Sequence, residues 1–275
     1  MSRTSPELLL RNRRGDTARV SADGAQLLSW CTAAQGEQIY LSPVPVAAGR
    51  VPRGGVPICF PQFGTRGPLP KHGFARNLPW TILAPEAGSE DASQGRLQLE
   101  LAPRPDWPHA CRLLFEVRLG EGFLSLQLDV TNTGASTFDF TAAIHTYFAV
   151  PDVRQAELRG LAASRYEDAL DANQRRPASG TALTFPDEID SVYLGTPECL
   201  QLHAPGLPTR RICQHGFTDT VVWNPGPAKA AALGDMPAAD WVKMLCVEAA
   251  VVATPVVLAP GARWTGIQRV EISGD

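Results

Sequence analysis

The feature that most restricts the fold of this chain is an alternation of apolar and polar residues at every second position. It is clearest in residues 97–101, 113–119 and 124–131, where leucine, valine or phenylalanine recurs at alternate positions. Side chains of a β-strand point alternately to opposite faces, so this pattern predicts half-buried strands with one face towards solvent. Gly120 and Gly122 separate the last two segments and predict a hairpin turn.

Shorter apolar segments continue the pattern along the chain, and turns rich in Gly and Pro separate them. There is no alternation of strands with long amphipathic helices, so we expect an all-β, antiparallel sandwich or barrel. These further strands are expected within residues 142–150, 198–204, 219–225, 242–252 and 266–272.

Two segments are less regular. Residues 238–246 have helical spacing but are short, and the polar residues 84–96 are expected to form an exposed loop between strands. The chain has no internal repeat and no low-complexity linker. We therefore expect residues 1–275 to form a single domain.

Composition and charge restrict the partners. Hydrophobic residues make up 44% of the chain, enough for a sizeable core, and the formal net charge is −3. A dedicated nucleic-acid binder is usually strongly basic, so we expect no nucleic-acid partner. The most apolar stretch, residues 244–260, contains Glu248, Thr254 and Pro255, and so lacks the roughly 18 uninterrupted apolar residues of a membrane span. We expect no membrane partner, and residues 1–14 do not have the pattern of a signal peptide.

The six cysteines are scattered through apolar segments and form no C-x-x-C pair. Secreted disulfide frameworks are denser and usually shorter. We therefore expect reduced, mostly buried thiols in a cytoplasmic protein.

Local motifs for several chemistries are missing. The sequence contains no phosphate-binding P-loop, no dinucleotide-binding glycine motif, no H-E-x-x-H metal helix and no G-x-S-x-G nucleophile elbow. The five histidines are far apart, without the spacing of metal ligands. Histidines and carboxylates from distant segments can still meet in the fold.

Residues 53–80 form an unusual stretch that combines five prolines with basic and aromatic residues. Proline removes backbone donors, so a regular helix or a long central strand is excluded. Arg53 precedes two glycines, where the backbone can turn sharply, and His72 and Arg76 flank Gly73. Arginine and aromatic side chains together suit a sugar face plus an anionic group. The alternative is a loop that caps the sandwich and exposes its charges to solvent.

An ordered set of motifs resembles the hexose-6-phosphate mutarotases, also called glucose-6-phosphate 1-epimerases. These form a branch of the aldose 1-epimerase, or galactose mutarotase-like, superfamily. The resemblance covers about residues 50 to 260 and implies a single large antiparallel β-supersandwich. The motifs are RGGVPICFPQFG (53–64), HGFARNLPW (72–80), AAIHTYFAV (142–150), DEIDSVYLG (187–195), GFTDTVVWNPG (216–226) and MLCVEAA (244–250).

The resemblance implies an isomerase that interconverts the α and β anomers of glucose 6-phosphate and related sugar phosphates. Opening the ring requires a general acid for the ring oxygen and a general base for the C1 hydroxyl, and no metal or organic cofactor. By resemblance, His145 is the acid and Glu248 is the base. Without the resemblance, His145 could be a satisfied histidine in a half-buried strand. Glu248 lies in an apolar segment, where a carboxylate is either paired or kept for function.

The resemblance also assigns the substrate-binding residues. Asp190 is expected to hold sugar hydroxyls, and His72 to bind a hydroxyl or support the transition state. Arg53 and Arg76 correspond to the pair that contacts the sugar phosphate. Lys71 stands where relatives often carry glutamine, so it either adds charge at the phosphate or faces solvent.

Several nearby charged residues have no family role. Arg66 lies in the same loop as the phosphate-binding arginines. For Asp187, Glu188 and Asp219 we expect exposed caps or loop hydrogen bonds, and for Asp190 the alternative is a turn cap near Pro186.

Two other functions stay open. One is an aldose 1-epimerase that acts on unphosphorylated sugars, although a neutral sugar does not compensate two desolvated cations. The other is a non-catalytic carbohydrate-binding protein, because a fold alone does not imply activity. In each case the expected partner is a small sugar, and the expected state is a monomer.

Overall fold

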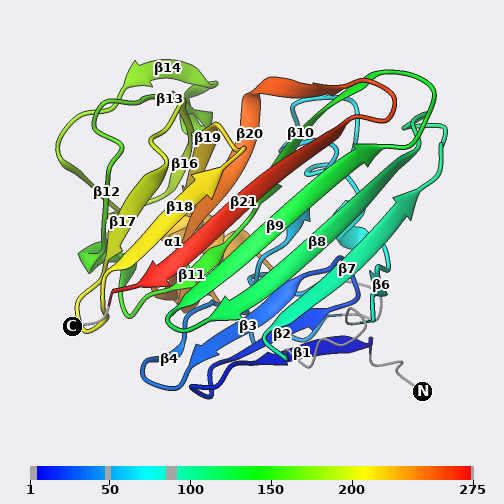
Figure 1. The fold of residues 1–275 in the computed structure, drawn as a ribbon. Coiled ribbons are helices and arrows are strands. Elements are labelled where there is room, and N and C mark those ends of the chain that lie inside the picture. Colours follow the sequence, from blue (N-terminus) through cyan, green and yellow to red (C-terminus); the bar gives the residue numbers. More distant parts are fainter. Residues whose placement is uncertain (1–4, 47–50, 85–91, 274–275) are drawn as a thin grey trace.

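The computed structural model describes residues 5–46, 51–84 and 92–273. Within these ranges the strands form three sheets of four, eight and nine strands (Figure 1), and every strand ladder is antiparallel. The expected all-β class is therefore confirmed.

The nine-stranded sheet contains the segments with the clearest alternation. The expected hairpin joins its strands β8 and β9 through a turn at Glu121 and Gly122. In spatial order the strands are β15 (Ala182–Thr184), β12 (Glu157–Arg159), β17 (Cys199–His203), β18 (Arg210–His215), β21 (Arg263–Ile272), β9 (Phe123–Asn132), β8 (Cys111–Gly120), β7 (Gln94–Leu101) and β6 (Thr81–Ile82).

The eight-stranded sheet packs against the nine-stranded one and contains the motifs of residues 142–150 and 244–250. Its strand order is β14 (Gln174–Pro177), β13 (Arg165–Asp168), β16 (Ile189–Leu194), β19 (Asp219–Asn224), β20 (Met244–Leu258), β10 (Phe138–Ile144) and β5 (Ile58–Cys59), with β11 (Tyr147–Ala149) also paired to β20.

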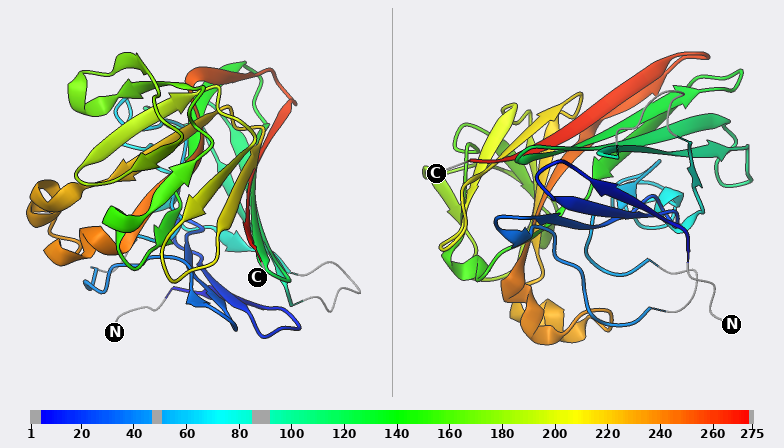
Figure 2. Two further views of the ribbon diagram at one scale, coloured as in Figure 1. Left: turned by 90° about the vertical axis from the view of Figure 1, so that its left-hand side faces the viewer. Right: turned by 60° about the horizontal axis from the view of Figure 1, so that its bottom comes forward.

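The four-stranded sheet is formed by the N-terminal part of the chain and lies at one end of the sandwich (Figures 1 and 2). The sequence did not predict it. In its first strand three leucines follow one another, and Leu9 is 66% exposed while Leu10 is buried, so no clear alternation is visible. Its strands in order are β1 (Glu7–Arg11), β2 (Thr17–Ser21), β3 (Leu27–Thr32) and β4 (Gly36–Glu37).

Helices are short. Residues 238–246 begin as a 3₁₀-helix that ends at Lys243, where β20 starts, and residues 226–232 form a short α-helix. In the described residues, none of the helices has the length and apolar character that crossing a membrane requires. The helices are α1 (Gly226–Ala232), η1 (Ala75–Asn77), η2 (Val153–Gln155), η3 (Ala169–Asp171) and η4 (Ala238–Lys243).

The core lies between the two large sheets, and its largest buried cluster also includes side chains of the N-terminal sheet. All the apolar residues expected to point inwards from 97–101, 113–119 and 124–131 are buried there. Strand β20 differs because both of its faces are buried between Met244 and Val252. One face joins the main core through Val247 and Ala249, and the other carries Glu248.

Two expected segments have different boundaries. Residues 142–150 form two strands, because the backbone N–H of Thr146 donates to the carbonyl of Ile144 and interrupts the ladder there. The polar segment 84–96 is partly strand, since β7 begins at Gln94. Residues 85–91 of that segment lie outside the described ranges.

The expectation of reduced cysteines is wrong for one pair. Cys199 and Cys213 form a disulfide between β17 and β18, where the strand register places them directly opposite each other with Cα atoms 4.0 Å apart. The register of a distant pair is a property of the fold, and the cysteine spacing does not reveal it. The remaining cysteines are free, and all but the first are buried: Cys31, Cys59, Cys111 and Cys246.

Asp219 joins β19 to β20 and to the end of β16; the expected exposed cap is wrong for it, and of its three bonds only the one from Gly195 is the expected loop hydrogen bond. It is buried at the start of β19, and its carboxylate accepts from the backbone N–H groups of Val252 at 2.9 Å, Ala253 at 2.8 Å and Gly195 at 3.3 Å. We predict that Asp219→Ala lowers the free energy of unfolding by about 2–4 kcal/mol, because it leaves buried donors without an acceptor. Urea unfolding measures this loss.

The matched control is Asp139→Ala on β10, where the side chain is exposed. It is expected to change the free energy of unfolding by less than about 0.5 kcal/mol. Equal effects of the two variants would contradict the structural role of Asp219.

Candidate active site

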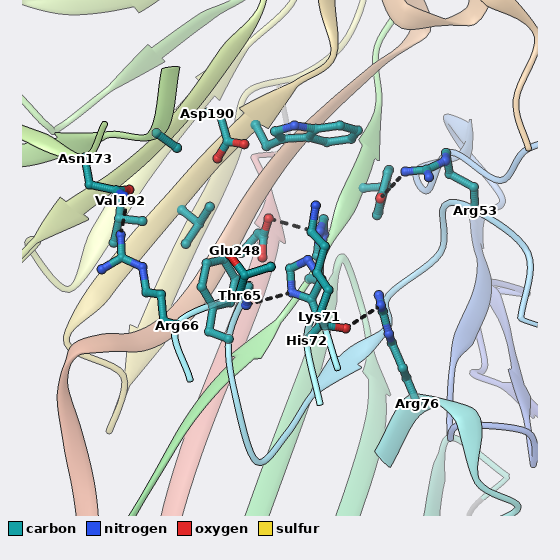
Figure 3. A pocket seen from close by; sticks show the side chains of 17 residues that line it. Arg53, Thr65, Arg66, Lys71, His72, Arg76, Asn173, Asp190, Val192 and Glu248 are labelled. Carbon is teal, nitrogen blue, oxygen red and sulfur yellow. Dashed lines mark hydrogen bonds and ion pairs between the residues drawn. The ribbon is translucent and has the colours of Figure 1, made fainter. Parts of the chain in front are cut away.

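A cavity of about 350 Å³, on the face of the eight-stranded sheet that points away from the main core, collects all the residues that the sequence assigned to substrate or catalysis (Figure 3). They come from the loop 53–80, from the β10–β11 junction, and from strands β16 and β20. The residues brought together in its lining are Arg53, Lys71, His72, Arg76, His145, Asp190 and Glu248.

Glu248 is positioned by the regular alternation of β20. It lies in the middle of the sheet, with Val221 of β19 as its register partner, and only 1% of its surface is exposed. Its neighbours Val247 and Ala249 point into the main core, so Glu248 points to the cavity side. The strand thus holds a carboxylate in an environment that otherwise accepts only apolar groups.

His145 is positioned by the interruption between β10 and β11. Its backbone N–H donates to the carbonyl of Pro57 at 3.0 Å in the proline-rich loop. At this junction the imidazole faces Glu248, with Nδ1 3.3 Å from Oε1 of the carboxylate. Two residues that are distant in sequence, but come from neighbouring segments of the eight-stranded sheet, thereby meet in the cavity.

The two groups keep unused hydrogen-bonding capacity. Within the described part of the chain, His145 Nδ1 and Glu248 Oε2 are buried and have no well-directed hydrogen-bond partner. Buried polar atoms are normally satisfied, and exceptions call for an explanation such as a catalytic or ligand-binding role. Since both residues line the cavity, a bound ligand could supply the missing partners.

Burial sets the protonation of this pair. It raises the pKa of Glu248 well above its usual value, and the negative charge of Asp190 adds to the effect. It lowers the pKa of His145 well below its usual value, and His72 adds to that effect. The carboxyl group and the imidazole therefore both favour their neutral forms, and because they lie in contact they titrate as a pair.

Two aromatic residues that the sequence reading did not single out complete this part of the wall. Tyr147 stacks on His145, with ring centroids 4.8 Å apart and planes at 9°, and Trp223 packs edge-on against both rings. Both line the cavity. Tyr147 could have been found by its spacing of two from His145, and Trp223 lies within the 216–226 motif.

His72 is held as a neutral hydrogen-bond donor. Burial, with help from Arg76, lowers the pKa of His72 to about 3. Its Nδ1 accepts from the backbone N–H of Gly64 at 3.3 Å and lies 3.2 Å from Cys59 Sγ, so we assign the ring proton to Nε2. His72 itself has φ +65°, and a Cβ at Gly73 would lie 2.2 Å from a backbone oxygen, so glycine is needed beside it.

Arg53 and Arg76, the arginines assigned to the phosphate, line one end of the cavity. Gly54 and Gly55 both have positive φ, which confirms the sharp turn expected after Arg53. The Nη1 of Arg53 lies 3.5 Å from the Tyr147 hydroxyl, and Nη2 of Arg76 donates to the Lys71 carbonyl at 2.9 Å (Figure 3). The Lys71 side chain is exposed and also lines the cavity.

Asp190 lies within β16, opposite Trp223 of β19, and does not cap a turn. Burial raises the pKa of its carboxyl group above the usual value. Its neighbours serve the scaffold: Asp187 accepts from the backbone N–H of Glu188, and Glu188 forms an ion pair with Lys229 at 2.6 Å. The first of these is the loop hydrogen bond that we expected.

Arg66 lies at the opposite end of the cavity from Arg53 and Arg76 (Figure 3). It forms an ion pair with Glu167 at 2.6 Å and donates to Asn173 at 3.3 Å. Arg66 matches no family motif, and these contacts link its loop to the β13–β14 region.

One group in the described ranges has the composition of a metal site. Ligand atoms of His145, Cys246 and Glu248 lie within 4.8 Å of one another. Cys246 is fully buried and does not line the cavity, so it is not available to a ligand there. The expectation of a site without a metal stays a prediction.

Comparisons with known proteins agree on the relatives of this chain. The family model described as aldose 1-epimerase matches residues 6–271. Proteins that carry the provisional name glucose-6-phosphate 1-epimerase are 37% identical in Cenchrus ciliaris (94% of this chain, 82% of the relative) and 37% identical in Escherichia coli K12 (85% and 79%). The solved structure of a provisionally assigned mutarotase from Salmonella typhimurium superimposes with a TM-score of 0.84 at 31% identity, covering 97% of this chain and 90% of that one.

The buried carboxyl group gives a test of the electrostatics. Because the pKa of Glu248 is raised in the folded state, its contribution to stability is present below the unfolded pKa of about 4.3 and is lost as the pH rises through the folded pKa. We predict that Glu248→Gln melts at a higher temperature than the parent protein at pH 8. One kcal/mol corresponds to roughly 2–4 °C in domains of 150–250 residues.

The gap in melting temperature should shrink as the pH falls towards 4, because the carboxyl group is then neutral in both states. The control Glu100→Gln, exposed on β7, should change the melting temperature at pH 8 much less than Glu248→Gln does. A Glu248→Gln variant that melts lower than the parent at pH 8 would refute the raised pKa.

Proposed function

The chain belongs to the aldose 1-epimerase family, and from this premise we propose that it interconverts the α and β anomers of glucose 6-phosphate and related hexose 6-phosphates. The observation that carries the proposal is the approach of His145 and Glu248 to 3.3 Å in a cavity whose one end is basic. An acid and a base beside C1, together with cations for a phosphate, are what this reaction requires.

The reaction uses the pair as follows. The carboxylate of Glu248 takes the proton from the C1 hydroxyl while the imidazolium of His145 protonates the ring oxygen. The bond between C1 and the ring oxygen breaks, and C1 becomes an aldehyde carbon. After rotation about the C1–C2 bond the ring closes on the other face, as Glu248 returns its proton and His145 recovers the other.

The protonation states of His145 and Glu248 in these steps agree with the electrostatics of the site. The pair holds one proton before ring opening, on His145, and one proton afterwards, on Glu248. The neutral form that burial favours in the free enzyme therefore has the same protonation as the pair facing the open-chain sugar. The short approach between the two groups lets the proton of neutral Glu248 pass to His145, which forms the ionised pair that ring opening requires.

The other lining residues fit substrate binding. We propose that Asp190 accepts from sugar hydroxyls and that the Nε2–H of His72 donates to a sugar oxygen. Arg53 and Arg76 bind the phosphate, and Lys71 adds charge beside it. Arg53 is paired with Asp235, but Arg76 has no carboxylate partner among the described residues, and a neutral sugar would not compensate its charge; this favours the phosphorylated substrate over galactose or glucose.

Three broader expectations stay proposals. We propose one catalytic domain over the whole chain, a monomer, and a cytoplasmic location. The disulfide between Cys199 and Cys213 removes the cysteine argument for that location, which now follows only from the proposed substrate.

The activity can be measured by NMR magnetisation transfer between the α and β H1 signals of glucose 6-phosphate. The protein is expected to accelerate exchange, and His145→Ala and Glu248→Gln are expected to lower kcat by roughly 10²–10⁴-fold, as for a lost general acid or base. Acceleration on galactose alone would assign the chain to the free-sugar branch. Binding of glucose 6-phosphate without faster exchange would support a carbohydrate-binding protein.

The phosphate site has its own test. Arg53→Ala and Arg76→Ala should each raise KM for glucose 6-phosphate by roughly 10- to 150-fold, because a hydrogen bond to a charged group contributes about 1.5–3 kcal/mol. The control Arg112→Ala removes an exposed arginine on β8 and should leave KM unchanged. Unchanged KM in both cavity variants would place the phosphate elsewhere.

A further inference from the structure

We propose that Asp235 is a positioning residue for the phosphate end of the site, which holds the guanidinium of Arg53 so that Nη1 is presented to the cavity. The inference rests on the proposed function. It assigns a role to an acidic residue beside a site for an anion, where a negative charge would otherwise be unfavourable.

The contact is a two-point clamp. Arg53 Nε donates to Asp235 Oδ1 at 2.6 Å, and Nη2 donates to Oδ2 at 2.8 Å. A bidentate pair fixes the plane of the guanidinium as well as its place. With Nε and Nη2 occupied, Nη1 is the nitrogen left for other partners, and it lies 3.5 Å from the Tyr147 hydroxyl.

The backbones on both sides of the clamp are joined through one residue. The N–H of Ser42 donates to the carbonyl of Arg53 at 2.9 Å, and its Oγ donates to the carbonyl of Asp235 at 2.7 Å. Asp235 lies in the turn between α1 and η4, far from Arg53 in sequence. Ser42 therefore holds the two partners in register independently of their side chains.

Asp235 contacts the side of the Arg53 guanidinium that faces away from the catalytic cavity. Asp235 does not line the cavity that contains His145 and Glu248. It lines a neighbouring cavity of about 400 Å³, which shares Arg53, Arg76 and Tyr147 with the first. The guanidinium thus separates the carboxylate from the substrate space and points into the cavity of Figure 3.

Holding Arg53 in this way has a clear benefit for binding. Arginine has a flexible side chain, and ordering such a side chain on binding costs free energy that a preorganised site avoids. Burial alone would lower the pKa of Arg53, but the hydrogen bonds and charge of Asp235, together with Tyr147, more than offset this, so the guanidinium stays charged. The site thereby offers a charged donor in a fixed direction.

A competing role predicts the opposite sign. If Asp235 only occupied the fork that a phosphate would use, removing its charge would free Arg53 and strengthen anion binding. Coulomb attraction alone also predicts stronger anion binding, since the variant removes one negative charge and makes the net charge of the site more positive. Positioning predicts weaker binding despite that gain.

The test is Asp235→Asn, which preserves shape and removes the charge. We expect KM for glucose 6-phosphate to rise roughly 2- to 10-fold, the cost of ordering one side chain on binding, with little change in kcat. The control Glu157→Gln neutralises an exposed ion pair on β12 and should leave KM unchanged. A KM that is unchanged or lower in Asp235→Asn would overturn the proposal.

A double-mutant cycle separates positioning from a general structural effect. If Asp235 acts through Arg53, then Asp235→Asn changes nothing further in an Arg53→Ala background. An equal loss in both backgrounds would mean that Asp235 supports the fold in another way, and would also overturn the proposal. Asp235→Ala serves as a second variant, with its thermal unfolding measured alongside.

A binding measurement separates failure of this inference from failure of the proposed function. Inorganic phosphate is titrated into the parent protein and into Asp235→Asn by calorimetry, which does not depend on activity. Weaker phosphate binding in the variant supports the clamp even if no sugar is turned over. Equal or tighter binding rejects the clamp, even where the parent protein accelerates exchange on glucose 6-phosphate.

Discussion

The site depends on the burial of one carboxyl group in a strand with two buried faces. Glu248 lies in the middle of β20, and the strand cannot turn it to solvent without turning Val247 and Ala249 out of the core. A charge in that place is unfavourable, so the group favours its neutral form. The same burial that makes a charged Glu248 unfavourable for folding raises its pKa and so favours uptake of a proton.

The second requirement is a group that can exchange the proton with Glu248, and an irregular backbone provides it. The ladder between β10 and β20 breaks at His145, where the chain bonds instead to Pro57 of the proline-rich loop. The loop therefore helps to position His145 and also supplies basic residues to the cavity. It also brings His72 beside His145, with ring centroids 5.5 Å apart.

The parts of the fold that could be predicted are those that depend on local sequence patterns. Period-two alternation in 97–131 identified strands and their inward faces, because side-chain direction in a strand depends only on position. The leucines of β1 do not alternate, so that sheet was missed. The site residues were identified from the ordered family motifs. Their convergence in one cavity depends on the fold, which the motifs do not describe. Contacts such as Cys199 with Cys213 and Arg53 with Asp235 depend on how distant segments pack, and neither residue of such a pair identifies its partner.

One arginine at each end of the cavity is paired with a carboxylate. Arg66 is paired with Glu167 and Arg53 with Asp235, so each of these arginines is held by a carboxylate. Glu167 is 7% exposed and also binds a second arginine, whereas Asp235 lies in a turn and binds only Arg53 among the pairs of the described residues. A carboxylate shared between two arginines serves to join segments. Asp235 instead binds two nitrogens of one arginine and leaves the third, Nη1, directed towards Tyr147, which stacks on His145.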